Sequence, residues 1–233
     1  MEIEKLTQEL QKTLGDNLKS IILYGSQASG EATKNNSDYN LLLIIDTTSF
    51  SVLKALSKPL EKWLKANNKP PLIFSSESFK NSADVFPIEF LDMKSTHKIL
   101  YGVSPFDALN ISTENLRHEC EFELKGKLLK LKQGYLLTRG NSAELKKLLI
   151  GSVSTFLVLF KSLLRLTGTP IPIKKLDALK LVAEKTGLNP EPFETVYAMK
   201  EGRSGPKDLE ALFEKYLNEV EKAADFADRF NAK

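Results

Sequence analysis

The chain has 233 residues, of which 42% are hydrophobic and 27% charged, with a formal net charge of +3. That length and apolar content suffice for a buried core and for one large or two small domains. The single cysteine, Cys120, excludes an intramolecular disulfide and fits a reducing cytoplasm. The longest apolar stretch, Leu148 to Phe160, contains several polar residues and is too short to span a bilayer, which predicts a buried helix and no membrane partner.

Up to about residue 105, helical and strand patterns alternate. In chain order they predict a helix over 3–14, strands over 20–24 and 39–46, a helix over 51–66, and strands over 71–75 and 85–93. The first helix is charged and amphipathic, unlike a signal peptide, so we expect a cytoplasmic protein.

The first strand ends at Tyr24-Gly25-Ser26. Because glycine has no Cβ, a phosphate can approach the backbone at Gly25, and Ser26 can add a hydroxyl and an N–H group at a helix start. These residues therefore predict an anion site. Taken alone, a Gly-Ser pair in such a place is more often only a turn.

The next strand begins near Asp38, Tyr39 and Asn40. Side chains alternate along a strand, so positions 38 and 40 share one face about 7 Å apart. Two carboxylates at that separation can hold magnesium ions, which orient a triphosphate and neutralise the charge that develops in nucleotidyl transfer. Asp38 supplies one carboxylate, whereas Asn40 offers a neutral carbonyl oxygen.

Two acidic residues lie on the predicted strand over 85–93. Glu89 and Asp92 have opposite parity there, so only one of them can face the site if the strand is regular. We favour Glu89, because the apolar residues Leu91 and Met93 share its face, and Asp92 stays the alternative.

Together these residues resemble the signature of the polymerase β-like nucleotidyltransferase superfamily, which is Gly-Ser, a loop, and Asp-x-Asp before an apolar strand. Gly25, Ser26 and Asp38 match it, while Asn40 departs from it. The loop has Gln27 and Ser29 where many small members carry arginines, and Lys34 is its only cation.

The resemblance, closest in outline to kanamycin nucleotidyltransferase and related small two-domain proteins, implies an α+β fold. It consists of a nucleotidyltransferase domain over 1–105, with a small mixed sheet flanked by helices, and an all-α helical domain over 106–233. It also implies a nucleoside triphosphate and an acceptor as partners and Mg²⁺ as cofactor, the acceptor being a small molecule, a protein or an RNA. The implied metal ligands are Asp38, Asn40 and Glu89, of which Asp38 and Glu89 are catalytic; Gly25, Ser26, Lys34 and Asn40 would bind the nucleotide.

Two functions stay open at this point because of Asn40. The chain is either a magnesium-dependent nucleotidyltransferase or a catalytically impaired relative that binds a nucleotide or a partner and regulates. Neither the acceptor, the nucleotide nor the oligomeric state follows from the sequence.

After a turn-rich linker over 101–105, the chain is predicted to be entirely helical. Helices are expected over about 116–135, 142–166, 174–186, 191–200 and 207–230. Residues 113–186 carry 14 Lys and Arg against 7 Asp and Glu. This charge has two interpretations. In one, an anionic acceptor or a triphosphate contacts Lys125, Lys127, Lys130 or Lys132. In the other, which we favour, these lysines belong to a solvated helix face with ion pairs such as Glu121 to Lys125. Cys120, His97 and His118 are given no catalytic or metal role.

Overall fold

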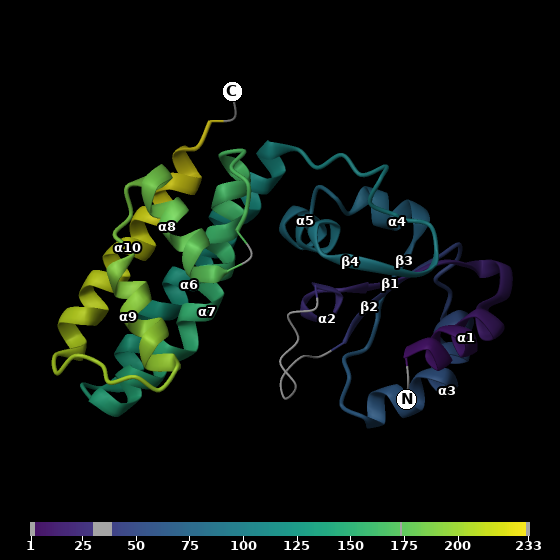
Figure 1. The fold of residues 1–233 in the computed structure, drawn as a ribbon, viewed down its shortest axis with the longest axis horizontal. Helices are drawn as coiled ribbons and strands as arrows, with labels where there is room; N and C mark the ends of the chain where they lie inside the picture. The colour runs from purple at the N-terminus through teal and green to yellow at the C-terminus, as the bar shows by residue number, and fades with distance from the viewer. Residues whose placement is uncertain (1–2, 30–38, 173, 232–233) are drawn as a thin grey trace. The chain divides into compact units, whose positions relative to one another are not determined.

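The structure, a computed structural model, describes residues 3–29, 39–172 and 174–231. The chain divides into two compact units, Met1–Ile111 and Ser112–Lys233, which we call the sheet unit and the helical unit (Figure 1).

The sheet unit contains a four-stranded sheet in the order β3-β2-β1-β4. Its strands are β1 (Leu18–Tyr24), β2 (Asn40–Ile45), β3 (Leu72–Ser75) and β4 (His97–Gly102). The central strand β1 pairs antiparallel with both β2 and β4, and β2 pairs parallel with β3. Because β1 and β2 are covered on both faces, they read as continuous apolar runs and not as alternating ones.

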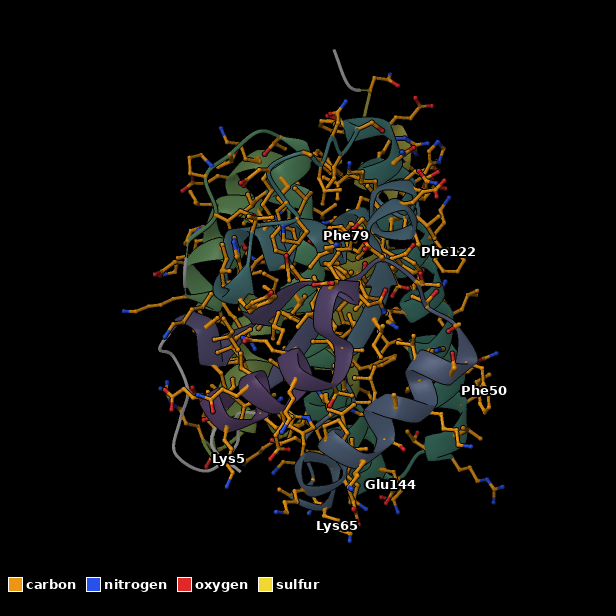
Figure 2. All side chains as sticks on the ribbon, turned by 90° about the vertical axis from the view of Figure 1, so that its right-hand side faces the viewer. Lys5, Phe50, Lys65, Phe79, Phe122 and Glu144 are labelled. Carbon is orange, nitrogen blue, oxygen red and sulfur yellow. The ribbon has the colours of Figure 1, made fainter. Side chains whose placement is uncertain are left out.

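Helices cover both faces of this sheet. On one face α1 (Ile3–Leu14) and α3 (Phe50–Lys65) pack with Leu23, Leu41 and Leu43; on the other, α4 (Ser76–Asn81) and α5 (Pro87–Ser95) pack with Ile22 and Leu42 (Figure 1). The second core is rich in aromatic rings. Phe79 lies inside it, whereas Phe50 projects from the surface of the unit (Figure 2).

The predicted strand over 85–93 is wrong, because this segment forms the helix α5. Pro87 stands at the start of the helix, where its fixed φ is favourable and its missing N–H is not needed. Ile88, Phe90 and Met93 are buried at steps of two and three residues, so the run of aromatic and β-branched residues covers the sheet instead of joining it. The fourth strand, β4, comes later and occupies part of the predicted linker over 101–105.

The division between the units also lies later than residue 105. Phe106 and Leu109 are buried in the core beside α4 and α5, with the Phe106 ring centroid 5.6 Å from that of Phe79. The segment after β4 therefore belongs to the sheet unit up to Ile111.

The helical unit comprises α6 (Thr113–Thr138), α7 (Ser142–Leu166), α8 (Lys175–Thr186), α9 (Glu191–Lys200) and α10 (Leu209–Arg229). Helix α7 is central, because it contacts each of the other four. Its Ser152 Oγ lies 3.0 Å from the hydroxyl of Tyr216 in α10, and burial raises the pKa of this tyrosine. The five predicted helices are thus confirmed, with α6 longer than expected.

By length and composition alone, α7 could cross a bilayer, since it has 25 residues and a window of mean hydropathy 1.7. The apolar stretch that the sequence singled out, Leu148 to Phe160, is only part of this helix, and Gly151, Ser152 and Ser154 interrupt the apolar run without ending the helix. Half of this apolar window of α7 is buried inside the protein. The central helix of a helical bundle meets the same criteria of length and composition.

Candidate functional site

A turn at Gly25 follows the end of β1, at the place where the sequence predicted an anion site. Gly25 has a φ of +80°, a conformation that glycine adopts without a steric penalty. Its N–H donates to the carbonyl of Thr96, at 3.2 Å, and its own carbonyl accepts from the N–H of Ala28, at 2.9 Å. The short helix α2 (Ser26–Ser29) follows directly. The turn is thus held from both sides by backbone hydrogen bonds.

Asn40, the predicted substitute for a metal carboxylate, lies beside this turn. It is the first residue of β2 and the direct cross-strand partner of Tyr24. A Cβ added to Gly25 would lie 3.1 Å from Asn40 Nδ2. The close approach depends on the missing side chain at Gly25, so the structure brings these two predicted site residues together.

The face on which this pair lies is set by strand parity. Asn40 has the parity of Leu42 and Ile44, whose side chains pack in the core covered by α4 and α5. The predicted residues Asp38 and Lys34 lie outside the described residues. Ser26 begins α2, directly after Gly25.

Glu89 and Asp92 require a correction, since both lie on α5 and not on a strand. The parity argument for choosing between them is therefore wrong. On a helix, residues three apart are neighbours with Cβ atoms about 5–6 Å apart, so both carboxylates can face the same region. Glu89 is exposed and Asp92 half-buried. Which of them acts as the third carboxylate stays a prediction.

His97 and Tyr24 also belong to this end of the sheet, and the sequence indicated a site role for neither. Tyr24 pairs with Asn40 on one side and with His97 on the other, so the three residues form a row across β2, β1 and β4. Burial raises the pKa of the Tyr24 phenol. His97 Nδ1 lies 3.1 Å from the carbonyl oxygen of Lys94. No sequence signal could have identified His97, because β4 itself was not predicted.

A metal centre is not complete among the residues that the structure describes. They contain no group of three or more His, Cys, Asp or Glu side chains that could hold a metal ion. Asn40 can lend one neutral oxygen. A magnesium site at this turn therefore depends on Asp38.

In the helical unit, the predicted basic cluster separates onto two sides of α6. Lys125 and Lys132 pair with carboxylates of α10, at 3.1 Å to Asp228 and 2.7 Å to Glu221. Lys125 also pairs with Glu121, as the sequence indicated, and this pairing raises the lysine pKa and lowers that of the glutamate. For these two lysines the structural interpretation holds.

Cys120 is expected to be unreactive in the folded protein. It is 1% exposed, and burial raises its pKa to about 12. Because the thiolate is the nucleophile, only about one thiol in ten thousand is ionised at pH 8 at such a pKa. We expect Ellman's reagent to modify the native protein at least about 100-fold more slowly than the protein unfolded in guanidinium chloride. Equal rates in the two states would show that Cys120 is accessible.

Comparisons with known proteins agree with this architecture. No family model and no curated protein matches the sequence. Among solved structures, the chain is similar to the spectinomycin adenyltransferase AAD(9) from Enterococcus faecialis, crystallised with ATP and spectinomycin, with 16% identity and a TM-score of 0.56 over 94% of this chain and 98% of that one. A toxin–antitoxin structure with AMP-PNP shares 17% identity over 55% of this chain and 95% of that one, with a TM-score of 0.33. The likeness to the adenyltransferase shows the fold and confirms the predicted class, a nucleotidyltransferase fold followed by a helical unit.

Proposed function

We propose that the protein is a nucleotidyltransferase that moves a nucleoside monophosphate from a nucleoside triphosphate to a hydroxyl group or other nucleophile of an acceptor. The observation that carries this proposal is the close approach of Asn40, the first residue of β2, to Gly25, which directly follows β1. A glycine turn next to a polar side chain, where one central strand of the sheet ends and the other begins, is suited to a phosphate chain bound at the following helix start. The adenyltransferase of similar fold was crystallised with ATP, which agrees with this assignment.

In the proposed reaction, the nucleophile attacks the α-phosphorus and the bond to the β-phosphate oxygen breaks, so that pyrophosphate leaves. The turn at Gly25 would let the phosphates approach the chain, and Ser26 and Lys34 would bind them. Glu89, or Asp92 beside it on α5, would accept the proton of the attacking group. Magnesium, held by Asp38 and Asn40 with Glu89 as the third ligand, would neutralise charge on the phosphates. We further propose that the protein is cytoplasmic and that its helical unit selects the acceptor.

A second candidate function rests on the same asparagine. With an amide in place of a carboxylate, the site can lack the charge needed to hold a metal–triphosphate complex in its reactive geometry. The protein would then bind a nucleotide or a partner and act as a regulator.

Nucleotide binding separates these possibilities and is expected to be weak. One missing carboxylate and a loop with few cations lead us to expect a dissociation constant near 1 mM for a magnesium–triphosphate complex, or about −4 kcal/mol. Calorimetry with each of the four triphosphates would measure it, with EDTA and Asp38→Ala as controls that should abolish the signal. Micromolar binding in the presence of EDTA would contradict the metal-dependent site.

Catalysis requires a second measurement. Pyrophosphate release should appear with magnesium or manganese once a suitable acceptor is present, and Asp38→Ala should abolish it. Metal-dependent binding without pyrophosphate release across a broad panel of hydroxyl and amine acceptors would support the regulatory alternative instead.

A further inference from the structure

The helical unit contains a groove whose lining residues have no named role in the proposed reaction. Its volume is about 270 Å³, and it lies between α6 and α7. Lys127 and Lys130 of α6 and Lys147 of α7 line it, together with the apolar side chains of Leu131, Leu148 and Phe156. We call it the α6–α7 groove. It combines a cationic rim with an apolar floor, as ligand pockets with a few placed polar groups do.

The three lysines of the groove differ in whether they pair with a carboxylate. Lys127 pairs with Glu123 at 3.2 Å and Lys147 with Glu144 at 2.7 Å, each within its own helix. Lys130 has no carboxylate within ion-pairing distance among the described residues, and none of the described residues that line the groove is acidic. Three lysines and two glutamate partners leave one uncompensated positive charge, which suits a ligand with a single negative charge and not a triphosphate.

The floor of the groove is built to remain apolar. Leu131 and Phe156 are 2% and 1% exposed, so they are fixed in the core below. Ser152 donates its hydroxyl to the carbonyl of Leu149, at 2.9 Å, and lies next to Tyr216, so it has no spare proton for a ligand. Leu131, Phe156 and Ser152 therefore offer a ligand apolar contact, and the exposed Thr155 is the other hydroxyl residue that lines the groove.

Gly151 keeps the groove open. It lies inside α7, where glycine costs about 1 kcal/mol relative to alanine, yet a Cβ at this position would meet no atom within 4 Å. Neither backbone conformation nor packing within the helical unit explains a glycine there. By contrast, Gly134 of α6 is required by packing, since a Cβ would lie 2.6 Å from Leu148 Cδ1. The missing side chain at Gly151 leaves space over the apolar floor, and an added side chain would extend into the groove.

From these observations we propose that the α6–α7 groove binds a small organic monoanion with an apolar or aromatic body. The apolar body lies on Leu131, Leu148 and Phe156, and the anionic group faces Lys130. This site lies within the helical unit alone and does not depend on the proposed nucleotidyl transfer.

Two matched dyes test the proposal on the full-length protein. 8-Anilinonaphthalene-1-sulfonate carries the negative charge, and N-phenyl-1-naphthylamine has nearly the same body without it. Fluorescence titration should show saturable binding of the anionic dye, at least about tenfold tighter than that of the neutral dye, and sodium chloride should weaken only the anionic one. Absence of saturable binding, or equal affinity for the two dyes, would overturn the proposal.

Two pairs of variants locate the site. Lys130→Glu should weaken binding of the anionic dye by about tenfold, while Lys146→Glu, the same charge change outside the groove, should leave it nearly unchanged. Gly151→Leu should abolish binding of both dyes by filling the groove, whereas Gly126→Leu should not, although Gly126 also lies in a helix and a Cβ added there would meet no atom within 4 Å. Both leucine variants should fold, because leucine has a higher helix propensity than glycine.

The control variants can also overturn the proposal. Equal loss of binding in Gly151→Leu and Gly126→Leu, or in Lys130→Glu and Lys146→Glu, would show that the dye binds elsewhere and would overturn it. Asp38→Ala should leave dye binding unchanged, and ATP should not displace the dye. Displacement by ATP would overturn the assignment of a monoanion, and it would do so whether or not the protein transfers nucleotides.

Discussion

Changing Asn40 to Asp is expected to strengthen magnesium-dependent binding of a nucleoside triphosphate by about tenfold, or 1.4 kcal/mol. The substitution restores a second carboxylate beside Gly25 at nearly the same side-chain volume. A unit charge about 4 Å from another gains about 4 kcal/mol at an effective dielectric of 20, and loss of hydration offsets part of this gain. Calorimetry of both proteins with magnesium and ATP measures the difference.

The same variant should be less stable without metal. A second carboxylate adds negative charge to the site when no metal neutralises it, so we expect a melting temperature about 2–4 °C lower in EDTA and a larger upward shift with magnesium and ATP than in the native protein. Adding Asp38→Ala should remove the gain. If Asn40→Asp gives no additional response to metal, more than one residue of the pocket has been lost, and the regulatory function becomes the better explanation.

The largest loss of stability is expected from Gly102→Ala, at the end of β4. Gly102 has a φ of +78°, and a Cβ there would lie 1.8 Å from the carbonyl oxygen of Lys19. Since that atom belongs to the backbone of β1, the pairing of Ser20 with Gly102 and the hydrogen bond from Ser20 Oγ to the Val103 carbonyl, at 2.6 Å, must both shift. We expect a cost of more than about 4 kcal/mol, enough to leave much of the sheet unit unfolded.

Gly15→Ala is the matched control for this prediction. Gly15 also has a positive φ, of +51°, but a Cβ there would meet nothing within 4 Å. It should cost only the backbone strain, about 1 kcal/mol. Urea denaturation followed by circular dichroism and tryptophan fluorescence compares the two, because Trp63 lies in the core of the sheet unit. Equal losses would show that β4 adapts to the added methyl group.

The sequence predicted the elements whose burial produces a regular pattern. The strands β1 and β2 are covered on both faces and appear as apolar runs, and α1 appears as an amphipathic helix. The strand β4 was missed because its short apolar run, Ile99 to Tyr101, is exposed or half-buried and closely follows the segment that was taken for a strand. The helix α5 was mistaken for a strand because Val85, Phe86, Ile88 and Phe90 favour strands locally, while packing on the sheet decides their conformation.

The candidate site was predictable only in part for the same reason. The contact of Gly25 with Asn40 follows from two strands that the sequence identifies and from a turn whose composition is specific. The position of Glu89 relative to Asp92 depends on α5, and the place of His97 depends on β4, so errors in those two elements carried over to the site. The role of Lys130 could not be separated from that of Lys125 by charge alone, because only the packing of α6 against α7 and α10 shows which side each lysine occupies.

The order of the strands also has a consequence for the protein during its synthesis. The central strand β1 is made first, but its partners β2 and β4 both come later, and β4 supplies Gly102 only after most of the sheet unit has been translated. Until then the apolar strand has at least one open edge, which is a template for pairing with another chain. The carbonyl of Thr96 that accepts from Gly25 is likewise absent from a shorter chain. A nascent chain that has not yet reached β4 therefore exposes an aggregation-prone edge, and the turn at Gly25 gains its hydrogen bond to Thr96 only after that residue has been translated.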